Sequence, residues 1–219
     1  MSSFTRERFE SSLAQLGIQP SQDVFARLQA AYSQPGRHYH SARHIGACLT
    51  QFDSHRALAQ RPAEIEIALW FHDAIYDTKR SDNERHSADW AAKYLASERV
   101  AVDTIARVHA LIMATRHDAP VSDRDQQLLV DVDLGVLGQP ARVFDRYDAD
   151  IRREYHWVPW PQYVEARRAV LNGFLNRPRI YSTTTFVERF EAQARHNIAH
   201  AIDKLEHDST GSDRGNPHV

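Results

Sequence analysis

Histidine and aspartate side chains follow an apolar stretch of the chain at a point where the interior of a fold is expected. His72 and Asp73 come directly after the apolar residues of 65–71. Burying an imidazole and a carboxylate costs free energy unless each is hydrogen-bonded, ion-paired or bound to a cation. A satisfied polar pair that holds two helices together explains the His-Asp dipeptide as well as a metal site does. The other polar segments of the chain therefore decide between the two interpretations.

Two further segments supply potential partners for this pair. Upstream, RHYHSARHI places His40 and His44 four residues apart, which predicts one helical face, with His38 just before them. Downstream, LLVDVDLGVLG places Asp131 and Asp133 in an otherwise apolar stretch. Three separated segments thus direct polar groups toward a predicted core, and one divalent cation could satisfy all of them.

The ordered set resembles the HD superfamily of metal-dependent phosphohydrolases, which has a His, then a His-Asp pair, then an Asp on an all-α domain. His44, His72, Asp73 and Asp133 match that pattern in order and in kind. More narrowly, the chain resembles a small bacterial group of predicted metal-dependent HD phosphohydrolases in RHYHSARHI, ALWFHDAIYDT, NERHSA, LIMATRHD, DVDLGVLG and IRREY. The resemblance runs from about residue 37 to residue 197.

The resemblance implies that His44, His72, Asp73 and Asp133 hold a single divalent metal ion. Asp133 matches the final aspartate of the pattern, and Asp131 is expected to be a supporting partner or a cap, because residues two apart on a helix point to different sides. Two neutral imidazoles and two carboxylates balance a divalent charge, and a set without thiolate suits Mn²⁺, Fe²⁺, Co²⁺, Ni²⁺ or Mg²⁺. Four protein ligands leave positions for a substrate oxygen and for a water whose pKa the metal lowers toward about 7.

Three more residues are candidates for catalysis, each with a structural alternative. Long alarmone synthetase/hydrolases of the same superfamily have a Glu-Asp pair where this chain has Tyr76-Asp77, so the resemblance carries over a general-base role for Asp77 but not alarmone hydrolysis. Asp77 shares a helix face with Asp73 if the helix continues that far, and is otherwise a surface carboxylate. Glu84 could orient the water or be the capping-box acid of its helix. His117 could meet the substrate phosphate or a second metal, or face a helix dipole.

The elements that must position these residues are predicted to be helices. Apolar residues recur at spacings of three and four, and 8 glycines and 9 prolines leave few turns for a many-stranded sheet. We predict an all-α fold, a single HD-type helical bundle over residues 1–206, followed by a disordered tail over 207–219. About ten helices are expected, near residues 4–16, 24–32, 38–52, 62–71, 82–94, 102–115, 126–137, 144–155, 161–175 and 185–205.

Composition narrows the environment and the partners. The 27 basic and 29 acidic residues give a net charge of -2, which provides no field to attract nucleic acid or an anionic membrane. No apolar run is long enough for a membrane span, and the single cysteine, Cys48, cannot form an internal disulfide. The polar start of the chain lacks the apolar segment of a signal peptide, so a cytoplasmic location is expected, with the oligomeric state open.

We therefore expect a metal-dependent phosphohydrolase that acts on a small phosphorylated compound, with a nucleotide as the expected substrate, through a metal-activated water. One alternative is a di-iron oxygenase of HD type. It needs two further histidines between the His-Asp pair and the last aspartate, for which His86, His109 and His117 are loosely spaced candidates. The other alternative is a metal or nucleotide sensor that keeps the ligands without turnover.

Overall fold

The computed structural model describes residues 3–19 and 23–211, with side chains as far as 207. In these ranges it contains ten α-helices, three short 3₁₀ helices and no strand, which confirms the predicted all-α fold of about ten helices. The chain divides after Asp133 into two compact units, each with its own internal packing. The single domain over 1–206 stays a prediction, and each unit is described on its own.

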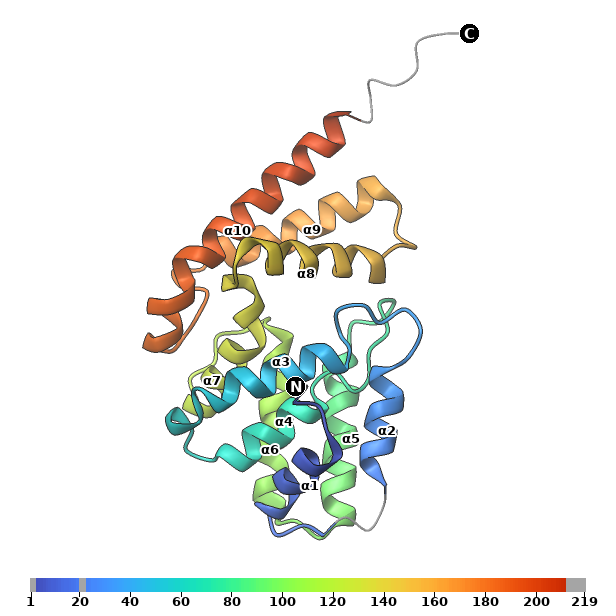
Figure 1. Cartoon of the computed structure of the whole chain (residues 1–219), viewed down its shortest axis with the longest axis vertical. Helices are drawn as coiled ribbons and strands as arrows, with labels where there is room; N and C mark the ends of the chain where they lie inside the picture. The colour runs from blue at the N-terminus through green and yellow to red at the C-terminus, as the bar shows by residue number, and fades with distance from the viewer. Residues whose placement is uncertain (1–2, 20–22, 212–219) are drawn as a thin grey trace. The chain divides into compact units, whose positions relative to one another are not determined.

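The first unit is built around one central helix (Figure 1). Its elements are α1 (Arg6–Ala14), α2 (Val24–Tyr32), α3 (Ala42–Asp53), η1 (Arg56–Leu58), α4 (Pro62–Phe71), α5 (Asn83–Ser97), α6 (Val102–Met113), η2 (Ala114–Arg116) and α7 (Arg124–Asp133). Helix α4 contacts α1, α3, α5, α6 and α7. The central place predicted for this apolar segment is thereby confirmed.

Helix α4 is buried over its whole length after the first turn. Every residue from Glu64 to Phe71 is buried, because apolar side chains cover all sides of the helix. Its buried acidic residues are ion-paired, as Glu64 accepts hydrogen bonds of 2.6 and 2.8 Å from Arg107. At the other end the Trp70 ring meets Phe9 edge-on, with ring centroids 5.1 Å apart. The last turn of α4 is therefore held firmly in the core.

The third helix starts later than the predicted range of 38–52. Ser41 is extended, with φ -125° and ψ 174°, and the first helical residue is Ala42. His40 therefore precedes the helix, and the prediction that it shares a helical face with His44 is wrong. The physical reason is that Ser41 has the extended backbone of an N-cap residue, so the helix begins at the next residue, Ala42.

The predicted helix over 126–137 is two elements. The α-helix ends at Asp133, and a 3₁₀ helix, η3 (Leu134–Gly138), follows it and belongs to the second unit. The carbonyls of Leu134 and Leu137 accept hydrogen bonds from side chains of the second unit, which takes the place of continued α-helical bonding.

The second unit consists of η3, α8 (Ala141–Glu154), α9 (Trp160–Leu175) and α10 (Thr184–Gly211). Helix α10 packs closely against η3: Asn197 donates a 2.8 Å hydrogen bond to the Leu137 carbonyl, and a Cβ added at Gly138 would lie 2.5 Å from the Cβ of Phe190. Residues 207–211, predicted to start the disordered tail, belong to α10 instead. The rest of that predicted tail, 212–219, lies outside the described residues.

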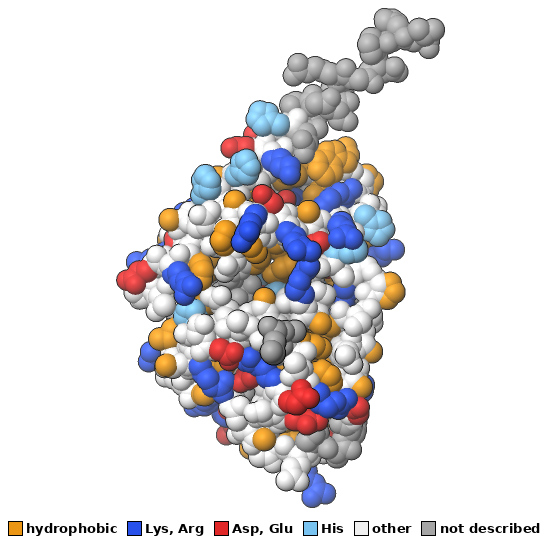
Figure 2. Space-filling view, in the orientation of Figure 1, with side chains coloured by type: hydrophobic (Ala, Val, Ile, Leu, Met, Phe, Trp, Pro, Cys, Tyr) orange, Lys and Arg blue, Asp and Glu red, His pale blue; other side chains and the backbone are white. Residues whose placement is uncertain are grey.

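The surface carries mixed charge. In the lower part of the face drawn in Figure 2, acidic and basic side chains lie next to one another. Among the described helices, none combines the length and the apolar character that a membrane crossing needs.

Candidate metal centre

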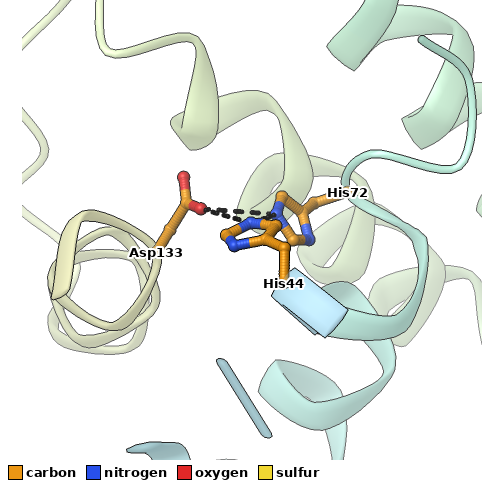
Figure 3. Close-up of side chains that lie close together, drawn as sticks. All are labelled: His44, His72 and Asp133. Atoms are coloured by element: carbon orange, nitrogen blue, oxygen red, sulfur yellow. Dashed lines mark hydrogen bonds and ion pairs between the residues drawn. The ribbon is translucent and has the colours of Figure 1, made fainter. Parts of the chain in front are cut away.

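Three elements of the first unit bring polar side chains to one point (Figure 3). His44 comes from the first turn of α3, His72 from the end of α4 and Asp133 from the last position of α7. The Nε2 atoms of the two histidines lie 3.1 Å apart. Oδ1 of Asp133 lies 3.1 Å from Nε2 of His44 and 3.4 Å from Nε2 of His72. The predicted final aspartate, and not Asp131, supplies the oxygen of this group.

Asp73 adds a second carboxylate to the cluster. Its Oδ2 lies 3.3 Å from Nε2 of His44 and 3.0 Å from Nε2 of His72. Neighbouring residues on a continuous helix splay apart, but α4 ends at Phe71, so Asp73 turns back toward the imidazole beside it. The Asp73 carboxylate therefore contacts both imidazoles of the group formed by His44, His72 and Asp133, and its role as a fourth ligand stays a prediction.

The spacing of the atoms from His44, His72 and Asp133 fits a single bound cation. Ligands bound at about 2.1 Å lie about 3.0 Å apart when they subtend a right angle at the ion, and about 3.4 Å apart in a tetrahedral arrangement. The three distances among Nε2 of His44, Nε2 of His72 and Oδ1 of Asp133 run from 3.1 to 3.4 Å. Two nitrogens and two carboxylate oxygens without a thiolate suit the harder divalent ions. The donor set thus fits the metal that the sequence predicts, without selecting one ion.

The pKa shifts in the cluster indicate that a bound cation would replace protons on the imidazoles. Burial by itself lowers the pKa of the His72 imidazole, but the Asp73 and Asp133 carboxylates outweigh it and hold that pKa well above its usual value. Burial raises the pKa of Asp133, but hydrogen bonds from His117, His44 and His72 outweigh burial and hold that pKa well below its usual value. The carboxylates are therefore ionised, and a metal would displace protons from the imidazoles.

Contacts behind the imidazoles orient them. Nδ1 of His72 lies 3.0 Å from the Leu69 carbonyl, so this nitrogen keeps its proton, and displacement of the Nε2 proton by a metal would leave the Nε2 lone pair facing the cluster. The Tyr39 ring lies 4.6 Å from the His44 ring, and Sγ of Cys48 lies 3.6 Å from Nδ1 of His44. Both imidazoles are buried, with 5% exposure for His44 and 1% for His72. These contacts fix the orientation of the two rings, which favours binding of a cation.

Of the three predicted catalytic residues, His117 contacts the cluster and Glu84 interacts with it electrostatically. Nε2 of His117 donates a 3.1 Å hydrogen bond to Oδ2 of Asp133. Glu84 stands in the first turn of α5, where burial and the Asp73 charge raise its pKa while Arg116 and His117 oppose that rise. The Glu84 carboxylate is therefore within electrostatic reach of the predicted ligands. Asp82, at the N-cap of this helix, makes no side-chain capping bond.

Asp77 lies in the loop after α4 and not on a helix. Helix α4 ends at Phe71, so the shared helix face with Asp73, which required a longer helix, is not formed, and the alternative of a surface carboxylate describes Asp77. Its side chain is exposed, and Oδ1 accepts a 2.9 Å hydrogen bond from the backbone N–H of Lys79. A catalytic role for Asp77 stays a prediction that this geometry does not favour.

The sequence reasoning missed the side chains that hold the loop after Asp73. Oγ of Ser87 accepts a 3.0 Å hydrogen bond from the Ile75 N–H, and Asn83 bonds both backbone groups of Asp77 at 2.9 and 3.1 Å. Both residues stand in the first turns of α5. The phrase NERHSA contains both, but nothing in its spacing indicates that they face a loop.

No family model, curated protein or solved structure matches this chain. The fold and the site thus define an all-helical protein whose first unit carries a candidate divalent-metal centre.

Proposed function

We propose that the protein is a divalent-metal-dependent hydrolase of small phosphorylated compounds, of the HD type that its motifs resemble. The observation that carries the proposal is the group of His44, His72 and Asp133, whose ligand atoms lie 3.1 to 3.4 Å apart, with an Asp73 oxygen 3.0 and 3.3 Å from the two Nε2 atoms. Two imidazole nitrogens and a carboxylate oxygen at that spacing suit one cation and leave part of its coordination to other ligands, of which Asp73 is the predicted fourth.

A divalent ion bound there would supply Lewis acidity toward a phosphoryl oxygen and would lower the pKa of a nearby water. The chain's own residues divide the remaining tasks. Asp133 is oriented by His117, and Asp73 is oriented by the turn after α4. Glu84, whose pKa burial raises, is suited to hold a water and to accept its proton beside the cluster.

The contacts of the remaining histidines favour hydrolysis over a di-iron oxygenase. Among the three histidines available for a second iron, His86 pairs with Asp82 at 3.1 Å and His109 faces Asp89 at 3.3 Å. His117 alone contacts the cluster. A second iron would need another of them, so we keep the oxygenase as an alternative that the contacts do not support. The sensor alternative uses the same ligands, and it differs from an enzyme in that the bound compound is not converted.

The test is release of phosphate or pyrophosphate from a panel of nucleotides and sugar phosphates by Mn²⁺-loaded protein. Asp73→Ala removes a predicted ligand and should abolish release. Asp89→Ala serves as the matched control, because it removes a carboxylate that faces His109 on the surface of the same unit and should leave activity unchanged. Full activity in Asp73→Ala would refute the proposal. Silence across the panel, in protein shown to hold metal, would favour the sensor or oxygenase.

A further inference from the structure

Arg37 connects the two turns that lead into the candidate ligands. It follows Gly36, whose φ of +92° is a left-handed conformation that glycine adopts without strain. The half-buried guanidinium donates from Nη1 to the carbonyl of Asp73 at 2.6 Å and to that of His40 at 3.1 Å. Its Nη2 donates to the carbonyl of Ala74 at 3.0 Å. One side chain therefore joins the turn before α3 to the turn after α4.

Two of the carbonyls that Arg37 binds, those of Asp73 and Ala74, lie beyond the end of α4, where the helix no longer supplies hydrogen-bond donors. The last carbonyls of a helix and those just beyond it need capping groups from elsewhere. Asp73 and Ala74 lie past Phe71, the last residue of α4. A planar guanidinium with five N–H groups can serve several carbonyls at once, which a lysine ammonium cannot do in the same geometry.

The guanidinium is itself held in place. The Tyr32 and Tyr76 rings lie 5.4 and 5.6 Å from its central carbon, within cation–π range. Nε donates to Oε1 of Gln34 at 3.3 Å. With contacts on its faces and edges, Arg37 can hold the backbone around it at a set separation.

We propose that Arg37 is a positioning residue of the metal centre. Through the carbonyls of His40 and Asp73, it sets the separation between the segment that leads to His44 and the segment that carries Asp73. The inference rests on the proposed metal centre, because it assigns Arg37 a role in that centre's affinity and not only in folding.

The test compares Mn²⁺ binding to metal-free protein by titration calorimetry with stability in urea. Arg37→Met removes the guanidinium, and Arg37→Lys keeps the charge but loses the planar fork. Arg107→Met is the matched control, because Arg107 holds the buried Glu64 at the opposite end of α4. Glu64 and His72 are separated by about 12 Å of helix axis.

We expect both Arg37 variants to bind Mn²⁺ about tenfold more weakly than the wild type, as the loss of a supporting contact does at other metal sites. Arg107→Met should lose stability and keep its dissociation constant. Wild-type affinity in folded Arg37→Lys would overturn the inference, as would an equal loss in Arg107→Met. A wild-type protein that binds no Mn²⁺ would instead refute the proposed metal centre. If Arg37→Met does not fold, Arg37→Lys decides.

Discussion

His117 and Asp133 are joined by a 3.1 Å hydrogen bond from Nε2 to Oδ2, while the other oxygen of the same carboxylate faces the two buried imidazoles. Both oxygens of Asp133 are thereby engaged, one by a supporting donor and one by the cluster. His117 has a φ of +56°, which is uncommon for a residue with a side chain. The left-handed backbone of His117 and this hydrogen bond together place its imidazole at Oδ2 of Asp133, the oxygen that the His44 and His72 imidazoles do not use.

His117→Ala should weaken Mn²⁺ binding about tenfold to a hundredfold, because a carboxylate that loses its supporting donor is no longer oriented toward the ion. His117→Gln keeps an N–H donor and should recover part of the affinity. Titration calorimetry measures both. An unchanged dissociation constant in His117→Ala, with loss of turnover, would instead assign His117 to the substrate, as one of the sequence interpretations has it.

The stability of the metal-free protein should fall as the pH rises above neutral. The pKa values of His44 and His72 are raised in the folded state, so their contribution is fully present below about 6.5, the value in an unfolded chain, and is lost as the pH rises through the folded values. The pKa values of Asp73 and Asp133 are lowered, so their contribution is lost only as the pH falls below about 3.9.

Bound metal should reverse that trend, because the ion takes the place of the imidazole protons and binds more tightly as the pH rises. Urea unfolding at about pH 6.5, 7.5 and 8.5, once with a chelator and once with saturating Mn²⁺, measures both effects across the window above the usual histidine pKa. Parallel pH profiles in the two series would show that the ion does not bind at these imidazoles.

Glu84→Gln should lower kcat by about a hundredfold or more, the usual loss when a general base is removed, with little change in Mn²⁺ affinity. The reason is that the Glu84 carboxylate interacts electrostatically with Asp73 but is not one of the closely spaced ligands. Glu98→Gln, at the opposite end of α5, is the control and should be fully active. A loss of metal affinity equal to the loss of kcat would make Glu84 a support for the ion.

Gly138→Ala should destabilise the second unit by about 1–3 kcal/mol, as other overpacking substitutions do. Its Cβ would lie 2.8 Å from the backbone oxygen of Phe190, which has no rotamer that could move it away. Gly173→Ala on α9 has nothing within 4 Å and should stabilise the helix by up to about 1 kcal/mol. Urea unfolding measures both, and Mn²⁺ affinity should not change in either, because all four ligands belong to the first unit. A stable Gly138→Ala variant would contradict the close packing of η3 on α10.

The helical fold and the central place of α4 were predictable because they depend on local patterns. Apolar side chains on every side of residues 65–71 leave that helix no stable position except the interior. The ends of the elements were less predictable, since the extended Ser41 and the change from α7 to η3 have no strong signal in the sequence. These ends matter for the site, because the place where α4 stops decides where Asp73 and Asp77 point.

The sequence alone specifies the chemistry of the candidate ligands: two imidazoles and two carboxylates, with His72, Asp73 and Asp133 in or directly after apolar stretches. It also establishes the helices, since the spacing of apolar residues along a helix is a local property. Only the packed structure establishes that the Asp73 and Asp133 carboxylates each lie within 3.4 Å of Nε2 of His44 and His72, that Arg37 binds the Asp73 carbonyl and that His117 binds Asp133. Distances between remote segments depend on how α3 and α7 pack against α4, and no local pattern encodes that packing.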